Sequence, residues 1–254
     1  MDKFGHIKLT GVARLLLLSC AIYACQQQQE EIPKKPVKPT LTYTYTYRKR
    51  SDDGTGKFYA NREIAQIMTA EGAAWLNLKD QQKEASAKMA IDHMNLMPNS
   101  VVADIGAGTG YYTFRIAKRI PYGKVFAVEI QDDLIRYLNT RKQETGDSNV
   151  VVIKGDAKSP HLPDSSLDLA IMIDVYHELE YPKEMMQFVS KALKKTGKLL
   201  LIEYRAEDPK LHINPLHKMS VAQINKEMGM NGFRLSYDGE FLPFQHFLMY
   251  EKAP

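Results

Sequence analysis

A short stretch holds the residue types that most often bind small charged ligands, an acid followed by glycines: Asp104, Gly106, Ala107, Gly108 and Gly110. Glycines let the chain turn tightly and let a ligand lie against bare backbone. The apolar residues 101–103 before the acid are typical of a buried parallel strand, and residues 111–120 behind the glycines have apolar side chains at helical spacing. A helix that begins there offers unpaired N–H groups and the positive end of its dipole. The stretch predicts the first half of a nucleotide-binding βαβ unit.

The spacing of the glycines separates two cofactor classes. Dinucleotide sites use G-x-G-x-x-G, with a pyrophosphate at the helix N-terminus. Here Tyr111 stands where the third glycine would be, and an acid lies two residues before the first glycine. That acid suits an ammonium group and opposes a pyrophosphate. The sequence D-I-G-A-G-T-G of residues 104–110 resembles motif I of the class I S-adenosylmethionine-dependent methyltransferases. A glycine-rich loop without a ligand is the alternative.

Later acids follow further predicted strands. Glu129 comes about twenty residues after the glycine turn, where an acid can accept both hydroxyls of a ribose; the alternative is a surface carboxylate. Ile130 can lie against the adenine face. By the same resemblance Asp156 matches the residue that contacts adenine, although Gly-Asp is also a common turn pair. Asp174 aligns with motif IV, which borders the methyl-transfer site in the family, and Asp104 is expected to hold the methionine end of S-adenosylmethionine.

The resemblance implies an in-line displacement in which the cofactor supplies an activated methyl group. The protein then positions the nucleophile and excludes water. The candidates for substrate contact or proton removal are Asp174, Tyr176, His177 and Arg205. His177 is a candidate base because the ordinary pKa of histidine lies near neutrality; a hydrogen-bonded structural histidine is an equal alternative. Arg205 suits a substrate anion, whereas an ion pair with Glu207 or Asp208 is the more common fate of such a residue.

The remaining pattern predicts an α/β fold. Strands are expected at residues 101–103, 124–130, 150–154, 167–173 and 198–202, with helices at 59–76, 81–97, 111–120, 134–138, 182–193 and 220–230. Residues 194–197 are expected to cap the helix before them with cations and a glycine. Residues 233–239 and 246–251 alternate as a closing antiparallel pair. The fold class is a Rossmann-like three-layer sandwich with a mostly parallel seven-stranded sheet, an antiparallel C-terminal hairpin and N-terminal accessory helices.

The N-terminus predicts export. Basic residues precede an apolar run, residues 15–24, which is shorter than the roughly twenty apolar residues of a membrane span. Cys20 and Cys25 both resemble the cysteine of a bacterial lipobox; the longer apolar run favours Cys25, and Tyr23 keeps Cys20 open. We therefore expect a lipid anchor in the cell envelope. An uncleaved anchor is the alternative, which by the positive-inside rule leaves the body at the cytoplasmic face.

Four segments follow from these patterns. They are a lipoprotein signal segment (1–25), a disordered linker (26–56), an N-terminal helical cap that helps to shape the substrate pocket (57–98), and a class I methyltransferase domain (99–254). Within the linker, the alternating Thr and Tyr residues 42–47 could add an edge strand but are expected to stay mostly unpaired. The 44% of hydrophobic residues suffice for a core, and the net charge of +4 does not demand a nucleic acid partner.

The cysteines and histidines limit the chemistry. Both cysteines lie in the N-terminal segment, so the folded body has no disulfide, thiolate zinc site or cysteine nucleophile. His212, His217 and His246 are irregularly spaced, and we expect no metal. Residues 174–178, 203–209 and 217–219 resemble a group of predicted secreted bacterial methyltransferases. We expect a small-molecule acceptor, lipophilic if the chain is anchored, with no nucleic acid; the sequence does not indicate the oligomeric state.

Two other functions stay open. The first is a non-catalytic S-adenosylmethionine-binding sensor or scaffold, because the cofactor is made in the cytosol whereas the N-terminus predicts export. The second is a nicotinamide oxidoreductase, against which Tyr111 and the C-terminal hairpin both count.

Overall fold

The computed structural model describes residues 45–69 and 81–254, all within the unit Tyr43–Pro254. A small antiparallel sheet comes first, formed by β1 (Thr46–Tyr47), β2 (Gly54–Tyr59) and β3 (Arg62–Ala65). The main sheet and its helices follow: α3 (Gln81–His93), β4 (Val101–Ile105), α4 (Thr113–Arg119), β5 (Lys124–Glu129), α5 (Asp132–Thr145), β6 (Val150–Lys154), β7 (Leu167–Ile173), α6 (Pro182–Ala192), β8 (Leu193–Tyr204), α7 (Val221–Met230), β9 (Phe233–Gly239) and β10 (Gln245–Lys252). Two short 3₁₀ helices, η2 (Tyr176–Glu178) and η3 (Pro215–His217), lie in the connections.

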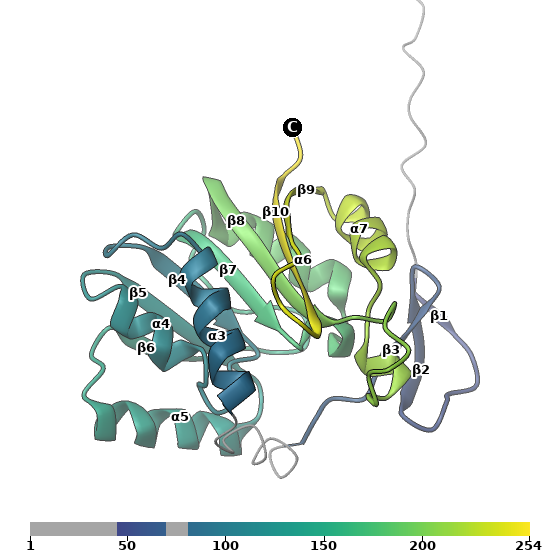
Figure 1. Ribbon diagram of the computed structural model, residues 1–254, viewed down its shortest axis with the longest axis horizontal. Coiled ribbons are helices and arrows are strands. Elements are labelled where there is room, and N and C mark those ends of the chain that lie inside the picture. The colour runs from purple at the N-terminus through teal and green to yellow at the C-terminus, as the bar shows by residue number, and fades with distance from the viewer. Residues whose placement is uncertain (1–44, 70–80) are drawn as a thin grey trace, which may run out of the picture. The chain divides into compact units, whose positions relative to one another are not determined.

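The main sheet has seven strands in the order β6-β5-β4-β7-β8-β10-β9 (Figure 1). The first five in this order pair in parallel, and β10 pairs antiparallel with both β8 and β9. The chain leaves β4 to one side for β5 and β6 and then returns to the other side for β7 and β8. At such a change of direction the loops beyond the strand ends separate and leave a crevice for a ligand.

Both faces of the sheet are buried by helices, as the three-layer prediction requires. Successive residues of β4 point to opposite faces. Val102 packs in a core with residues of α3, α4 and α5, and Ala103 packs in a second core with residues of α6 and α7. The predicted fold class, with its mostly parallel sheet and C-terminal hairpin, is confirmed.

The segment before α3 differs from the prediction. Residues 59–65, expected in a helix, form the end of β2 and all of β3, while residues 70–76 of that expected helix lie outside the described residues. Ala60 and Asn61 both have positive φ, +52° and +74°, which gives the two-residue hairpin turn that matches strand twist. Neither residue is a glycine, so the sequence lacks the usual signal for this turn. The second helix is confirmed as α3 but ends at His93.

The predicted linker is also shorter than expected. Residues 26–44 lie outside the described part of the chain, but Thr46 and Tyr47 pair with Phe58 and Lys57 of β2. Tyr45 donates a hydrogen bond from its hydroxyl to Glu184 of α6 at 2.5 Å. The Thr-Tyr repeat therefore ends in an edge strand, which pairs with β2 of a hairpin that the sequence pattern does not predict.

The glycine cap predicted after α6 is wrong. Leu193 begins β8 in an extended conformation, with φ −68° and ψ 134°, and Gly197 lies within that strand. A Cβ at Gly197 would lie 2.6 Å from the carbonyl oxygen of Leu167. The glycine thus permits close approach to β7 rather than a left-handed helix end. The predicted N-cap of α7 is confirmed, since the Ser220 hydroxyl accepts from the N–H of Gln223 at 3.2 Å.

Candidate active site

A cavity of about 620 Å³ lies beyond the carboxyl ends of β4, β5 and β7. Nearly all residues predicted to hold the cofactor line it: Asp104, Gly106, Ala107, Gly108, Glu129, Ile130, Asp156 and Asp174. Gly110 is not among the lining residues. It has φ +74°, and a Cβ there would collide with Phe114, so its role is to let the turn pack on α4.

The turn requires glycine at position 106 for two reasons. Its φ is +75°, in the left-handed region that side chains disfavour, and a Cβ would lie 2.6 Å from Val175 Cγ2. The N–H groups of Gly106 and Ala107 both donate to the carbonyl oxygen of Val128, at 2.9 and 3.0 Å. The end of β4 is thereby folded against β5, and bare backbone faces the cavity.

Glu129 is held by the backbone around it. Its Oε2 accepts from the N–H of Gly108 at 3.0 Å, and its Oε1 accepts from Ile130 and Gln131 at 2.7 and 3.0 Å. The side chain is buried and lines the cavity. A carboxylate offers about four acceptor positions, so Glu129 can still accept from a ligand hydroxyl. The prediction of a ribose partner fits this position.

Asp104 is buried at the base of the turn. The hydroxyl of Thr113 donates to its Oδ2 at 2.6 Å. Burial raises the pKa of Asp104 to about 6, with a smaller contribution from the Glu129 carboxylate. A backbone hydrogen bond from Thr113 also reaches this carboxyl. A buried carboxyl that faces a cavity is well suited to an ammonium group, whose charge would restore its ionisation.

Asp156 lies at the half-exposed edge of the cavity. Its Oδ1 accepts from the N–H groups of Lys158 and Ser159 at 2.7 and 2.8 Å, and these bonds lower its pKa. Its Oδ2 pairs with His161 Nε2 at 2.9 Å. The Gly-Asp turn and the ligand-facing position predicted for this residue are therefore compatible.

Asp174 also lines the cavity, after the end of β7, and has a left-handed conformation with φ +54°. Gln245 Nε2 donates to both carboxyl oxygens, at 2.9 and 2.8 Å. Burial, together with the Glu203 carboxylate, raises the pKa of Asp174 to about 7. Partly buried acids in strained backbone conformations cluster at functional sites.

The other three catalytic candidates do not line the cavity, which corrects their predicted placement. Tyr176 is buried in the core and donates its hydroxyl to Glu227 at 2.9 Å. Arg205 contacts His246 Nδ1 at 3.3 Å and donates to the carbonyl of Leu242. It is not among the residues that line the cavity, and the ion pair with Glu207 or Asp208 that was its alternative is not formed.

His177 is buried next to the cavity rather than in its lining. Burial opposes a charge on the ring, but the Glu203 and Glu178 carboxylates outweigh burial and raise the pKa of His177 to about 10. Because His177 does not line the cavity, and because such a ring already holds its proton at neutral pH, its position favours the structural alternative over a base.

The sequence analysis missed part of the lining. The N-terminal hairpin contributes Tyr47, Thr55, Lys57 and Ala65, and the residues after it contribute Ile67 and Met68. The prediction that this segment shapes the pocket fits, although most of its lining residues come from strands and the loop after them, and one, Ser86, comes from helix α3. The ammonium of Lys57 lies over the rings of Tyr181 and Tyr45, at 3.2 and 4.2 Å, and has no hydrogen-bond partner in the described residues. Burial lowers the pKa of Lys57, although Glu180 and Glu184 oppose the shift.

Residues 96–238, more than half of the 254, match the protein family described as "Methyltransferase domain". The chain belongs to this family. The predictions of a methyltransferase domain and of S-adenosylmethionine as its cofactor are thereby confirmed, and the cavity lined by the glycine turn is the place where the fold would hold that cofactor.

Curated relatives match this methyltransferase over part of their length. Malonyl-[acyl-carrier protein] O-methyltransferase of Methylococcus capsulatus is 25% identical over 54% of each chain. Ubiquinone/menaquinone biosynthesis C-methyltransferase of Pseudomonas fluorescens is 24% identical over 46% of each. A shorter match, 41% identical over 27% of this chain and 23% of the relative, is to a probable ribosomal RNA small subunit methyltransferase A of Methanosarcina barkeri. The chain thus spans about half the length of the first two relatives and about a quarter of the third.

A solved structure supports the fold assignment. The crystal structure of a SAM-dependent methyltransferase from Aquifex aeolicus superposes with a TM-score of 0.67 and 21% identity, covering 72% of this chain and 98% of that one.

Proposed function

We propose that the protein transfers the methyl group of S-adenosylmethionine to a small-molecule acceptor. The observation that supports this best is one cavity with two unlike walls. On one side, Asp104, Glu129 and the glycine turn offer polar groups and bare backbone. On the other, the segment before α3 offers the apolar side chains of Ala65 and Met68. A volume of about 620 Å³ lies in the range of small-molecule sites, roughly 300–1,000 Å³.

The acceptor is proposed to be anionic or electron-rich, with apolar parts. Lys57 brings a buried cation without a hydrogen-bond partner in the described residues to the cavity, and such a cation favours an anionic group. Among the relatives, one is named for malonyl-[acyl-carrier protein] and another for ubiquinone/menaquinone biosynthesis, and neither name refers to a nucleic acid.

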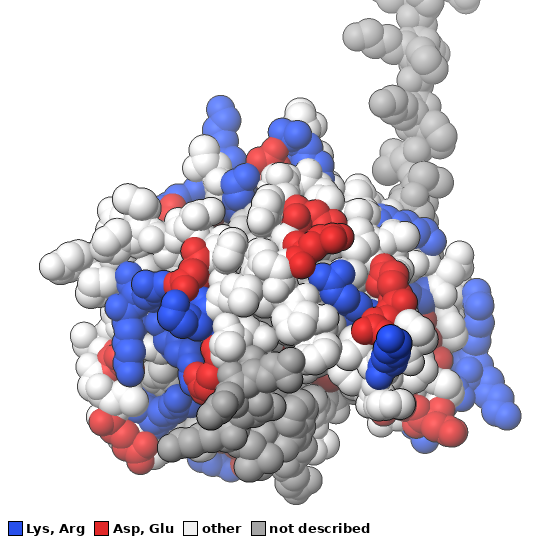
Figure 2. Space-filling view, in the orientation of Figure 1, with Lys and Arg blue, Asp and Glu red and all other residues white. Residues whose placement is uncertain are grey.

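A nucleic acid acceptor is disfavoured. On the face drawn in Figure 2, Lys and Arg side chains of the described residues are interspersed with Asp and Glu. A nucleic-acid surface would instead call for a basic patch or stripe. Because one short match is to a ribosomal RNA methyltransferase, an RNA fraction belongs in the activity test.

The test is transfer of a labelled methyl group from S-adenosylmethionine to fractions of bacterial extract separated into small molecules, lipids, protein and RNA. Label that appears in a small-molecule or lipid fraction, and disappears with the Gly106→Arg variant, supports the proposal. Binding of S-adenosylmethionine by calorimetry without transfer to any fraction would favour the sensor or scaffold instead. Measurable affinity for NAD without affinity for S-adenosylmethionine would revive the oxidoreductase.

The affinity for S-adenosylmethionine is expected to fall at low pH. Since the pKa of Asp104 is about 6, the carboxyl is mostly protonated below that pH and cannot accept from the cofactor's ammonium as a carboxylate. Lowering the pH from 7 to 5 should weaken binding about tenfold, because one pKa unit corresponds to a tenfold change. Calorimetry of the Asp104→Asn variant, which has no such proton to lose, should give weak binding with a flat profile. An unchanged slope in that variant would assign the effect to another carboxyl, with Asp174, whose pKa is about 7, as the first candidate.

Lys57→Met is expected to weaken acceptor use without affecting cofactor affinity. A hydrogen bond to a charged group is worth about 1.5–3 kcal/mol. The concentration of the active fraction that gives half-maximal transfer should therefore rise roughly tenfold or more. Lys158→Met is the matched control, because Lys158 is exposed, lies over the same Tyr181 ring at 4.7 Å and does not line the cavity. Equal half-saturation in the two variants would remove Lys57 from the acceptor site.

We also propose that Cys25 carries a lipid anchor that holds the enzyme in the cell envelope. Residues 1–44 lie outside the described chain, and no helix within residues 45–69 and 81–254 has the length and apolar character of a membrane span. Metabolic labelling with a palmitate analogue should mark the protein and the Cys20→Ser variant but not Cys25→Ser. The reverse pattern would move the anchor to Cys20, and an unlabelled wild type would contradict the anchor.

A further inference from the structure

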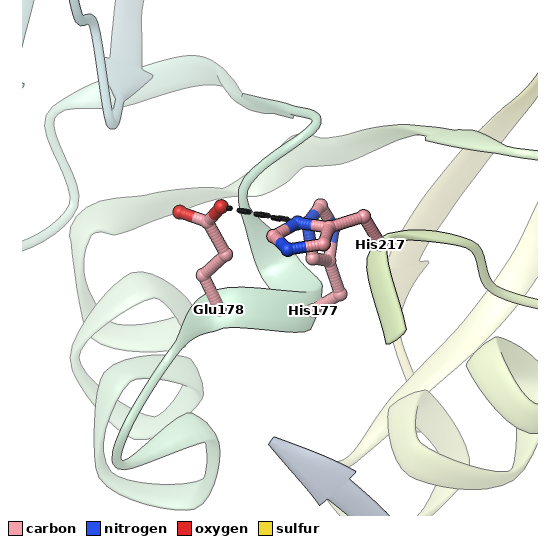
Figure 3. A group of neighbouring side chains, drawn as sticks. All are labelled: His177, Glu178 and His217. Atoms are coloured by element: carbon pink, nitrogen blue, oxygen red, sulfur yellow. Dashed lines mark hydrogen bonds and ion pairs between the residues drawn. The ribbon is translucent and has the colours of Figure 1, made fainter. Parts of the chain in front are cut away.

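Two histidines and a glutamate converge beside the cavity, from parts of the chain that are far apart (Figure 3). His177 and Glu178 belong to η2, and His217 ends η3. His177 Nε2 lies 2.9 Å from His217 Nδ1. Glu178 Oε1 lies 3.4 Å from His217 Nδ1 and 3.7 Å from His177 Nε2. These three atoms thus surround one point.

The outer nitrogens of both rings face carboxylates. His177 Nδ1 lies 2.6 Å from Glu203 Oε2, and His217 Nε2 lies 2.8 Å from Asp53 Oδ2. A carboxylate accepts from the N–H of an imidazole, so each outer nitrogen keeps its proton and the inner nitrogen is the one that can bind a metal ion once the proton shared there is displaced. Histidines that bind metal ions are almost always oriented in this way, by a carboxylate, carbonyl or water behind the ring.

The glutamate is the least satisfied member of the group. The side chain of Glu178 is 9% exposed, and its Oε1 has no hydrogen-bond partner in the described residues. A buried charged oxygen that lacks a hydrogen bond is costly. A cation at the common point would contact this oxygen together with both inner nitrogens.

We propose that His177 Nε2, His217 Nδ1 and Glu178 Oε1 bind a divalent transition-metal ion of the zinc type. With bonds of about 2.0–2.2 Å, tetrahedral ligands lie roughly 3.3–3.5 Å apart, and the observed 2.9, 3.4 and 3.7 Å bracket that separation. Two imidazoles and one carboxylate select zinc or a neighbouring metal over magnesium or calcium. Three protein ligands leave a fourth position for water or a substrate group.

The charges around the rings favour the ion as well. Three carboxylates, those of Asp53, Glu178 and Glu203, surround two imidazoles. Without metal, the two inner nitrogens can form their hydrogen bond only by sharing one proton. A divalent cation brings twice the charge of that proton, replaces it on binding, and engages Glu178 Oε1, which the proton leaves without a hydrogen bond.

The position links the ion to the proposed acceptor site. Glu178 lines the same cavity as Asp104 and Glu129, and Asp53 precedes the β2 strand that contributes Lys57. The ion would therefore tie the N-terminal hairpin to η2 and η3 at the cavity wall. The inference does not depend on methyl transfer, since the metal site can be tested without a methyl acceptor.

The test is a zinc titration of the full chain, stripped with a chelator, against a colorimetric zinc indicator. Cys20→Ser and Cys25→Ser are present throughout, because thiolates also bind zinc. We expect one zinc ion per chain. His217→Ala, which removes a ligand, should weaken binding at least roughly 100-fold, and Asp53→Asn, which removes only the group behind the ring, about tenfold or more. His212→Ala changes an exposed histidine of the same loop and should bind as the parent does.

Two results would overturn the proposal. One is a parent protein that binds no zinc, and the other is zinc binding that His217→Ala leaves unchanged. If His217→Ala fails to fold by circular dichroism, Glu178→Gln decides instead, because the amide has the same shape as the carboxylate but is a poor ligand. Cobalt gives an independent readout: the intense visible bands of a four-coordinate ion should appear in the parent and be absent from the variant that loses zinc.

Discussion

Gly106→Ala is expected to make S-adenosylmethionine binding at least roughly 100-fold weaker. The alanine at position 106 must adopt a φ of +75°, which costs about 1–2 kcal/mol for a residue with a Cβ. It also meets Val175 at 2.6 Å, and such overpacking costs a further 1–3 kcal/mol. Either the turn moves away from Val128, where Gly106 and Ala107 donate, or Val175 moves into the cavity. Calorimetric titration with S-adenosylmethionine measures the loss.

A second glycine separates backbone strain from collision. Gly146 has φ +70° at the end of α5, and a Cβ there would meet nothing within 4 Å. Gly146→Ala should therefore lose about 1–2 kcal/mol of folding stability in urea unfolding, with cofactor affinity unchanged. If Gly106→Ala binds the cofactor as tightly as this control does, the glycine turn is not the cofactor site.

The cofactor side of the cavity could be predicted because its geometry is local. An apolar run, an acid and a glycine turn specify where β4 ends, and parallel strands carry Glu129 and Asp174 to the same edge of the sheet. Gly106 illustrates this well, since its type alone indicates a tight turn. The position of each of these side chains follows from a few neighbouring residues and the sheet topology.

The opposite wall could not be predicted because it depends on contacts between distant segments. The turn at Ala60 and Asn61 has no glycine to mark it, so the sequence predicts a helix where the end of β2 and all of β3 lie. Tyr176 follows Asp174 closely in sequence, but η2 directs its ring into the core toward Glu227. The contact between His177 and His217 spans forty positions, and no spacing rule connects two histidines at that separation.

Arg62→Met is expected to cost about 3–5 kcal/mol of folding stability, because it leaves the buried Glu227 without its cation. Arg62 Nε and Nη2 donate to the two oxygens of Glu227 at 2.7 and 3.0 Å, and the Glu227 side chain is 0% exposed. The third donor, Arg62 Nη1, bonds the carbonyl oxygen of His177 at 2.9 Å. This one side chain thus joins β3 to α7 and to η2, and urea unfolding measures its loss.

The large loss of folding stability expected for Arg62→Met comes from the burial of the ion pair rather than from charge pairing alone. Two comparisons separate these two contributions. Lys88→Ala breaks an ion pair at 2.7 Å whose lysine is 79% exposed, and should change stability by about 0.5 kcal/mol or less. Combining Arg62→Met with Glu227→Met removes both charges, so the double variant should lose less than the sum of the two single losses. Strict additivity would contradict the buried pair. If the losses are not additive and Arg62→Met also uses the acceptor less well, Arg62 keeps the hairpin, and with it Lys57, at the wall of the cavity.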